Sequence, residues 1–222
     1  MSLNYSAIIS NELVEHTSQT LSGEENLSYY IDDTYGWSFL DRYSLNRLIE
    51  GSRITTFNVS HDNSKKIFIR NIFSRLDEII DIDFTEMSHN DGSMLDIYHV
   101  NYSSNFKPNV VGMAIPQESN SRSWWDILWK DAESNVNNNI NLNTIIHEIG
   151  HCLGLAHPYN DPNNKAYNSS DTVMSYNQGP NGWNEWFSVV DLNALISIWG
   201  RENDLGIVNF EENSIGYKYT KS

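Results

Sequence analysis

Residues 144–158 read TIIHEIGHCLGLAHP and contain the pattern HExxHxxGxxH. On an α-helix, residues four apart lie on one face about one turn apart, so His147 and His151 can direct their imidazoles at one ion. Gly154 can adopt a positive φ at low steric cost and can therefore end the helix in a sharp turn. That turn allows His157 to return as a third ligand. The stretch therefore predicts a helix and a turn that together hold one metal ion.

The donor set of this stretch favours zinc. Zn2+ binds imidazole nitrogens at about 2.0–2.1 Å, and three neutral histidines leave a fourth, open position for water. Glu148 follows the first ligand and can act as the general base that takes a proton from the zinc-bound water as it attacks a peptide carbonyl. The competing interpretation is an ordinary amphipathic helix. Against it, His147, Glu148 and His151 interrupt an otherwise apolar run, where unpaired polar groups are costly.

Composition excludes several classes of protein. The 222 residues are 39% hydrophobic and 12% aromatic, which is enough for a packed core and unlike a disordered chain. A formal net charge of -15 disfavours nucleic acid as a partner and is typical of a solvated acidic surface. No apolar run approaches the roughly 20 residues of a membrane-spanning helix. The one cysteine, Cys152, is interpreted as a small packing residue, and residues 1–23 lack the pattern of a secretory signal.

The order of periodic segments predicts a mixed sheet with helices packed on it. Residues 1–28 are polar and are expected to be loosely ordered, residues 29–203 to form one domain, and residues 204–222 to be a C-terminal extension. A short helix is expected within 29–51, and a long amphipathic helix from a cap at Asn63 or Ser64. The strands are expected at 54–59, 82–87, 94–100 and 110–115, followed by an apolar run at 124–129.

The extended motif resembles that of the metzincin clan of zinc peptidases, whose members also have a methionine-containing turn downstream. Met174 follows His157 by seventeen residues, in the run Asp171-Thr-Val-Met-Ser-Tyr176. Within the clan the run is most similar to that of serralysins, with matrixins and astacins as neighbours. The resemblance spans about residues 50–200, but only the zinc motif and this turn are specific.

The resemblance implies both a fold and further roles. The fold would be α+β, with a twisted mixed sheet, an antiparallel edge strand, a long backing helix, an active-site helix and a C-terminal helix at 191–200. Met174 would lie under the ligands as an apolar floor. Tyr176 would be a fifth zinc ligand at rest and would hydrogen-bond the oxyanion during turnover. A plain core tyrosine is the alternative interpretation.

The resemblance also implies a substrate and a location. The strand at 110–115 would pair with an extended peptide or protein substrate, and residues 177–187, with Trp183 and Trp186, would wall the pocket beyond the scissile bond. The protein would be extracellular or secreted. The calcium-binding β-roll and export region of serralysins are missing from the sequence, and the stretch between His157 and Met174 is short for a serralysin.

Three functions compete. The leading one is a metalloendopeptidase that cleaves peptide bonds. The second is a metzincin-fold binding module without turnover, which the intact Glu148 disfavours. The third is a zinc hydrolase of small amides, which the expected edge strand disfavours because such a strand suits extended peptides.

Overall fold

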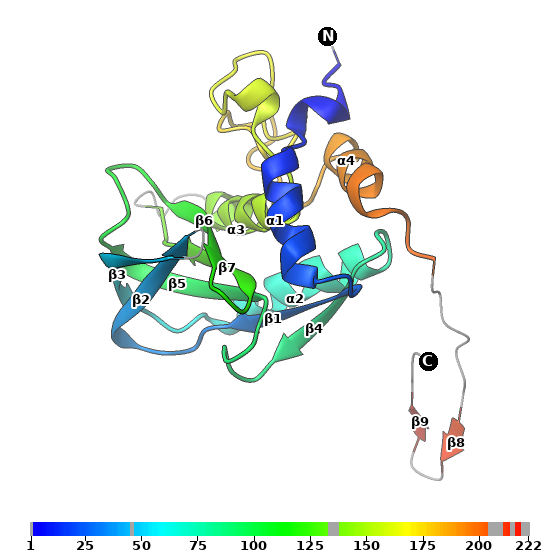
Figure 1. Cartoon of the computed structure of the whole chain (residues 1–222). Helices are drawn as coiled ribbons and strands as arrows, with labels where there is room; N and C mark the ends of the chain where they lie inside the picture. Colours follow the sequence, from blue (N-terminus) through cyan, green and yellow to red (C-terminus); the bar gives the residue numbers. More distant parts are fainter. Residues whose placement is uncertain (1, 45–46, 133–137, 204–210, 214–215, 219–222) are drawn as a thin grey trace.

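A twisted sheet of seven mixed-direction strands and four α-helices make up the fold of the described residues (Figure 1). The computed structural model describes residues 2–44, 47–132, 138–203, 211–213 and 216–218. The strands of the sheet are β1 (Asn26–Ile31), β2 (Gly36–Ser44), β3 (Arg47–Asn58), β4 (Asp83–Met87), β5 (Leu95–Ser103), β6 (Gly112–Glu118) and β7 (Ser123–Trp129). The helices are α1 (Asn11–Leu21), α2 (Asn63–Asp77), α3 (Asn138–Cys152) and α4 (Val189–Trp199), with 3-10 turns η1 (Tyr5–Ile8) and η2 (Pro158–Asn160). The predicted α+β, metzincin-like class is therefore confirmed.

Strand β5 organises the sheet. It pairs in parallel with β1 and with β7, and β4 extends the sheet in parallel beyond β1. β3 pairs antiparallel with the C-terminal half of β5, and β2 pairs antiparallel with β3. β6 pairs antiparallel with β7 and with no other described strand, so it is an edge strand. The predicted antiparallel edge strand is confirmed, although it begins at Gly112 and not at Val110.

The sheet is covered on both faces. All residues of β5 from Leu95 to Val100 are buried, as expected for a central strand between two layers. The larger core cluster joins one face to the helices, through residues such as Ile97 and Ile149. The smaller cluster lies on the other face, where the β2–β3 hairpin covers it; its buried members are Ile54, Tyr98, Val100, Ile115 and Leu128. The helices and the site they carry are therefore on one side of the sheet.

The long backing helix is where the apolar spacing predicts it. α2 buries Ile69, Ile72, Phe73 and Leu76, which form a stripe at three- and four-residue spacing. Its N-cap is Asp62, whose side chain accepts a hydrogen bond from the Lys65 backbone, and not Asn63 or Ser64 as expected. The helix therefore starts one residue earlier than predicted.

The short helix expected within 29–51 is wrong. This part of the chain forms the end of β1, then β2 and the start of β3. Trp37 on β2 lies directly opposite Phe57 on β3, and their ring centroids are 5.3 Å apart. Cross-strand pairs of this kind favour a hairpin, and they depend on residues about twenty positions apart, beyond a helical window.

The expectation of a loosely ordered segment at 1–28 is also wrong for the residues that are described. η1, α1 and the start of β1 occupy it, and Ile8, Thr17 and Leu21 are buried. Thr17 donates a hydrogen bond to the Cys152 carbonyl at 2.6 Å, so α1 is tied to the C-terminal end of α3. Burial of a hydrogen-bonded threonine explains why a polar sequence belongs to the folded body.

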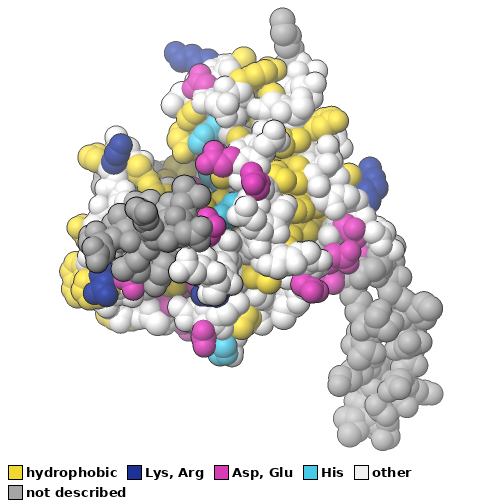
Figure 2. Space-filling view, in the orientation of Figure 1, with side chains coloured by type: hydrophobic (Ala, Val, Ile, Leu, Met, Phe, Trp, Pro, Cys, Tyr) yellow, Lys and Arg dark blue, Asp and Glu magenta, His cyan; other side chains and the backbone are white. Residues whose placement is uncertain are grey.

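The C-terminal part contains α4 and a small hairpin. α4 matches the helix expected at 191–200, and β8 (Glu211–Asn213) pairs antiparallel with β9 (Gly216–Lys218). None of the described helices combines the length and apolarity needed to cross a bilayer. Figure 2 shows acidic side chains spread over the face in view and not gathered at one place, in keeping with a solvated acidic surface.

Candidate metal centre

Three histidines converge at the end of α3. His147 and His151 lie one turn apart on this helix, and their ring centroids are 4.7 Å apart. Gly154 has φ +96° and turns the chain back, so that the His157 ring lies 4.9 Å from that of His151. One ring nitrogen from each histidine lies within 4.8 Å of the other two. The structure thus brings together all three residues that the sequence predicts as ligands.

Backbone carbonyls determine which nitrogen of each helical histidine faces its neighbours. His147 Nδ1 lies 2.8 Å from the Val173 carbonyl oxygen, and His151 Nδ1 lies 2.8 Å from that of Leu155. Because a carbonyl oxygen only accepts, each Nδ1 must carry the proton, which leaves Nε2 with a free lone pair. His147 Nε2 lies 3.3 Å from His157 Nε2. Three imidazoles converging in this way, two of them oriented by a carbonyl, fit a Zn2+ ion.

Burial keeps these histidines neutral. It lowers the pKa of His147 well below the usual histidine value, lowers that of His151 to about 4, and lowers that of His157. The neighbouring imidazoles lower the pKa values of the first two further. A neutral imidazole is the form that binds a metal, so the burial suits the donor set.

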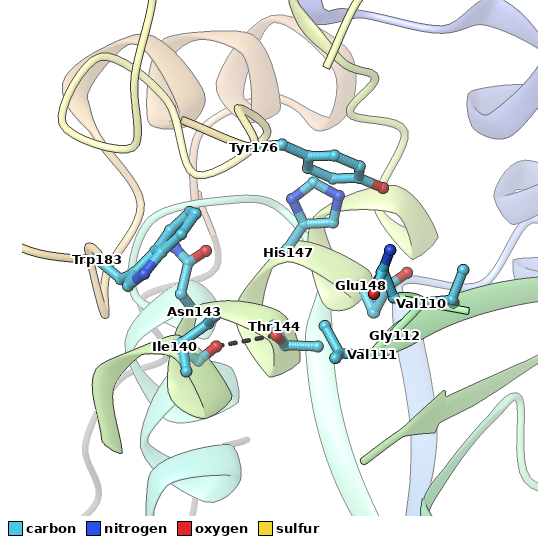
Figure 3. A pocket seen from close by; sticks show the side chains of 11 residues that line it. Val110, Val111, Gly112, Ile140, Asn143, Thr144, His147, Glu148, Tyr176 and Trp183 are labelled. Atoms are coloured by element: carbon cyan, nitrogen blue, oxygen red, sulfur yellow. Dashed lines mark hydrogen bonds between the residues drawn. The ribbon is translucent and has the colours of Figure 1, made fainter. Parts of the chain in front are cut away.

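Glu148 lies beside this group with its side chain in a cavity of about 210 Å3 (Figure 3). The residue is 5% exposed. Burial raises the pKa of its carboxyl to about 8, a rise that a hydrogen bond with the Ala114 backbone partly offsets. Gly112, at the start of β6, approaches so closely that a Cβ there would lie 2.4 Å from Glu148 Oε1. The missing side chain at Gly112 therefore gives the carboxylate its place between α3 and the edge strand.

The turn at Met174 packs against α3. Met174 is fully buried, and its sulfur packs against Gly150, where a Cβ would approach it to 2.8 Å. Gly150 thus leaves room for the methionine below α3. The preceding residue, Val173, supplies the carbonyl that orients His147. Met174 therefore packs against the helix that carries His147 and His151.

Tyr176 stands over the same group from the cavity side (Figure 3). Its ring centroid lies 5.3 Å from that of His147 and 5.0 Å from that of His157. The residue is 51% exposed, and burial of the phenol raises its pKa. A half-exposed tyrosine against two histidines is not a core tyrosine, so the alternative interpretation of Tyr176 does not hold.

The cavity extends from Glu148 along α3. Figure 3 shows Trp183 at its far end and Val110 and Val111 across from the helix. Its other lining residues are Asn109, Gly112, Ile140, Asn143, Thr144, His147 and Tyr176. Trp186, expected to wall the same pocket, instead lies against α2, where the Arg75 guanidinium stacks on its ring at 3.4 Å. Of the two tryptophans, only Trp183 lines the cavity.

One residue that supports the site escaped the sequence analysis. Asp191, in the first turn of α4, is fully buried and accepts hydrogen bonds from Thr172 Oγ1, from Val173 N at 3.0 Å and from Ser188 N at 2.7 Å. It thereby joins α4 to the turn that precedes Met174. The spacing Ser188-x-x-Asp191 is a capping box, and that pattern could have marked the residue as the helix start.

Comparison with known proteins agrees with this geometry. The family model Matrixin, of peptidase family M10, matches residues 23–173, which is more than half of the 222 residues. No curated protein matches the chain. The matched region contains all three histidines and Glu148, whereas α1, Met174, Tyr176 and α4 lie outside it. The match supports the metzincin clan that the motif implies, and within that clan it is to matrixins. The chain therefore belongs to the matrixin family of metzincin-type zinc metallopeptidases.

Proposed function

We propose that this chain is a zinc-dependent endopeptidase whose metal is held by His147, His151 and His157. The observation that carries the proposal is the convergence of three imidazole nitrogens within 4.8 Å, at one end of a cavity that Glu148 also lines. When bound, zinc would supply Lewis acidity, which lowers the pKa of water towards about 7 and polarises a carbonyl. The Val173 and Leu155 carbonyls orient two of the ligands.

Glu148 is the proposed general base. It takes a proton from the attacking water and delivers it to the departing amine nitrogen. Its position between α3 and Gly112, with no ion pair among its described contacts, supports this role. Burial raises the pKa of the carboxyl, and the positive charge of a zinc ion held beside it would favour the ionised form that accepts a proton. General-base assistance of this kind typically contributes about 10²–10⁴-fold in rate.

Tyr176 and Met174 are the proposed serralysin-like elements of the site. The phenol of Tyr176 can move between the histidine group and the cavity, since half of the residue is exposed. Its hydroxyl would donate a hydrogen bond to the oxyanion that forms as the carbonyl is attacked. Met174 would keep the floor beneath the ligands apolar, which its complete burial supports.

The proposed substrate is a peptide or protein in an extended conformation. β6 is an edge strand, and its unpaired side can form main-chain hydrogen bonds with a substrate strand. The cavity beyond Glu148 has apolar walls from Val110, Val111 and Trp183, which favours an apolar substrate side chain there. Its volume of about 210 Å3 limits how large that side chain can be.

We also propose that one peptidase domain, expected at 29–203, extends back through α1 to Leu3. The buried Leu3, Ile8 and Leu21, which belong to the main core cluster, support this boundary. An extracellular location is proposed from the family alone, since matrixins often act outside the cell.

The test compares wild type with Glu148→Gln and His151→Ala on a peptide library read by mass spectrometry, with and without a zinc chelator. We expect zinc-dependent cleavage by wild type, full zinc content without cleavage for Glu148→Gln, and loss of zinc for His151→Ala. Cleavage by Glu148→Gln at the wild-type rate would refute the general-base role. Zinc-loaded wild type that cleaves no peptide would refute the endopeptidase.

A further inference from the structure

The N-terminal segment of residues 3–21, here called the N-terminal brace, crosses the C-terminal end of α3. It comprises η1 and α1, and it precedes residue 23, where the family match begins. In Figure 1 α1 passes beside α3, and the chain before it runs towards α4 and the loop after α3. The brace is therefore an element outside the matched region that touches the active-site helix.

Backbone hydrogen bonds join the brace to the turn that precedes His157. Ser10 N donates to the Gly154 carbonyl at 3.0 Å, and Ala156 N donates to the Ile8 carbonyl at 2.8 Å. These two bonds flank an antiparallel bridge between Ile9 and Leu155. The chain leading to His157 is thus held by one antiparallel bridge and the two hydrogen bonds beside it.

The same turn also orients a second histidine. The Leu155 carbonyl, in the centre of the bridged segment, is the acceptor for His151 Nδ1 at 2.8 Å. A shift of Leu155 would therefore disturb His151 as well as His157. Two of the three converging imidazoles depend on residues that the brace contacts.

Packing of α1 fits the turn closely. A Cβ on Gly154 would lie 2.5 Å from Val14 Cγ2, so α1 lies directly against the glycine. Thr17 Oγ1 satisfies the Cys152 carbonyl, which belongs to the last turn of α3 and has no helical partner. Gly154 is thus required for its positive φ and also because α1 occupies the space of a side chain.

We propose that the N-terminal brace is a positioning element for the metal centre, which holds Gly154 to Ala156 so that His157 faces the other two histidines. The inference rests on the proposed function and deepens it. Without the brace, Gly154 and Ala156 lose their backbone partners, and the turn gains conformational freedom. Ordering that turn would then reduce the affinity for zinc, because binding would have to offset the lost entropy.

The experiment uses full-length protein and two matched variants of the brace. Ile8→Ala removes a fully buried side chain next to the bridge, and Leu21→Ala removes a buried side chain at the far end of α1. Folding is checked by circular dichroism, and zinc affinity is measured by competition with a chelator. We expect Ile8→Ala to weaken zinc binding about tenfold or more, as supporting residues of metal sites do, and Leu21→Ala to change it by less than about twofold.

Two further measurements separate positioning from general loss of stability. Cobalt(II) substituted for zinc should give a visible absorption spectrum that Ile8→Ala alters and Leu21→Ala does not, because the spectrum reports the ligand geometry. In a His157→Ala background, Ile8→Ala should weaken zinc binding by less than in wild type, because the histidine that the brace is proposed to position is then absent. Should Ile8→Ala fail to fold, Val14→Ala takes its place, because it makes a smaller change where α1 packs against Gly154 in the same turn.

Equal losses of zinc affinity from both brace variants, or none from either, would overturn the inference alone. Full additivity of the Ile8→Ala and His157→Ala losses would also overturn it. If wild type bound no zinc, the proposed function and this inference would both fail. If His157→Ala bound zinc as wild type does, the assignment of His157 as a ligand would fail, and the inference that the brace positions His157 would fail with it.

Discussion

Replacing Asp191 by alanine tests how much the contact between α4 and the turn at Met174 contributes to stability. The Asp191 carboxylate is fully buried and accepts hydrogen bonds from Thr172, Val173 and Ser188. The Val173 carbonyl in turn accepts from His147. The substitution therefore removes the acceptor that holds Val173, the residue whose carbonyl orients His147.

The magnitude follows from the donors left behind. Asp191→Ala leaves three donors without an acceptor: Thr172 Oγ1 and Val173 N are buried and Ser188 N is partly buried. Each buried group left unpaired costs about 1–3 kcal/mol. Allowing for partial relaxation, we expect a loss of about 3–6 kcal/mol, against a total of about 5–15 kcal/mol for a typical domain. Asp191→Asn keeps one carbonyl oxygen, which can still accept from Val173 N and Ser188 N, so its loss should be about 1–2 kcal/mol.

Urea unfolding, followed by tryptophan fluorescence, measures both variants. A chelator in excess removes any contribution of bound metal to the free energy of unfolding. The Asn variant is the matched control, because it keeps the shape of the side chain and loses only the charge and one acceptor. The reasoning would be refuted if Asp191→Ala lay within about 0.5 kcal/mol of wild type, the range of ordinary surface substitutions, or if the two variants were equally stable.

Three further substitutions test single contacts. Gly112→Ala places a Cβ 2.4 Å from Glu148 Oε1, so kcat/KM should fall about a hundredfold while zinc content, measured by atomic absorption, is unchanged. A residue other than glycine in the left-handed conformation costs roughly 1–2 kcal/mol, and Gly154→Ala should lower the free energy of unfolding by more than this because its Cβ also meets Val14. Adding Val14→Ala removes that clash, so in urea unfolding the double variant should regain only the part of the loss above the cost of the positive φ. Burial raises the pKa of Asp96 to about 8, so the folded protein keeps a proton that the unfolded chain releases. The free energy of unfolding should therefore fall as pH rises from the ordinary aspartate range to about 8, and Asp96→Asn should reduce this fall.

Each of these has a result that contradicts it. Wild-type kcat/KM in Gly112→Ala would show that Glu148 moves aside without loss. Complete recovery by Val14→Ala would show that the positive φ of Gly154 costs nothing. For the pH series, exposed Asp91 lines the same cavity as Asp96, and Asp91→Asn is the matched control. An Asp96→Asn slope equal to that of the control would contradict the buried, protonated carboxyl.

Local patterns explain what could be predicted. The helical spacing of His147 and His151 and the apolar stripe of α2 each depend on residues within one or two turns, and both elements are where the sequence predicts them. The strand expected at 54–59 lies largely within β3, but β2 and the start of β3 form where a short helix is expected, because the aromatic pair Trp37 and Phe57 is visible only after the strands meet. The resemblance likewise implies two tryptophans at the cavity, whereas Trp186 stacks on Arg75 of α2 instead.

The sequence by itself determined the chemistry of the site: the type, spacing and order of the three histidines and Glu148, together with the glycine that turns the chain after α3. These are short-range properties, because helical geometry converts spacing directly into direction. Only the tertiary structure decided what holds that chemistry in place. The Asp191 network and the N-terminal brace join residues from 18 to more than 140 positions apart. Such contacts exist only once burial has brought distant segments together, so a polar opening segment gave no sign that it packs against the turn before His157.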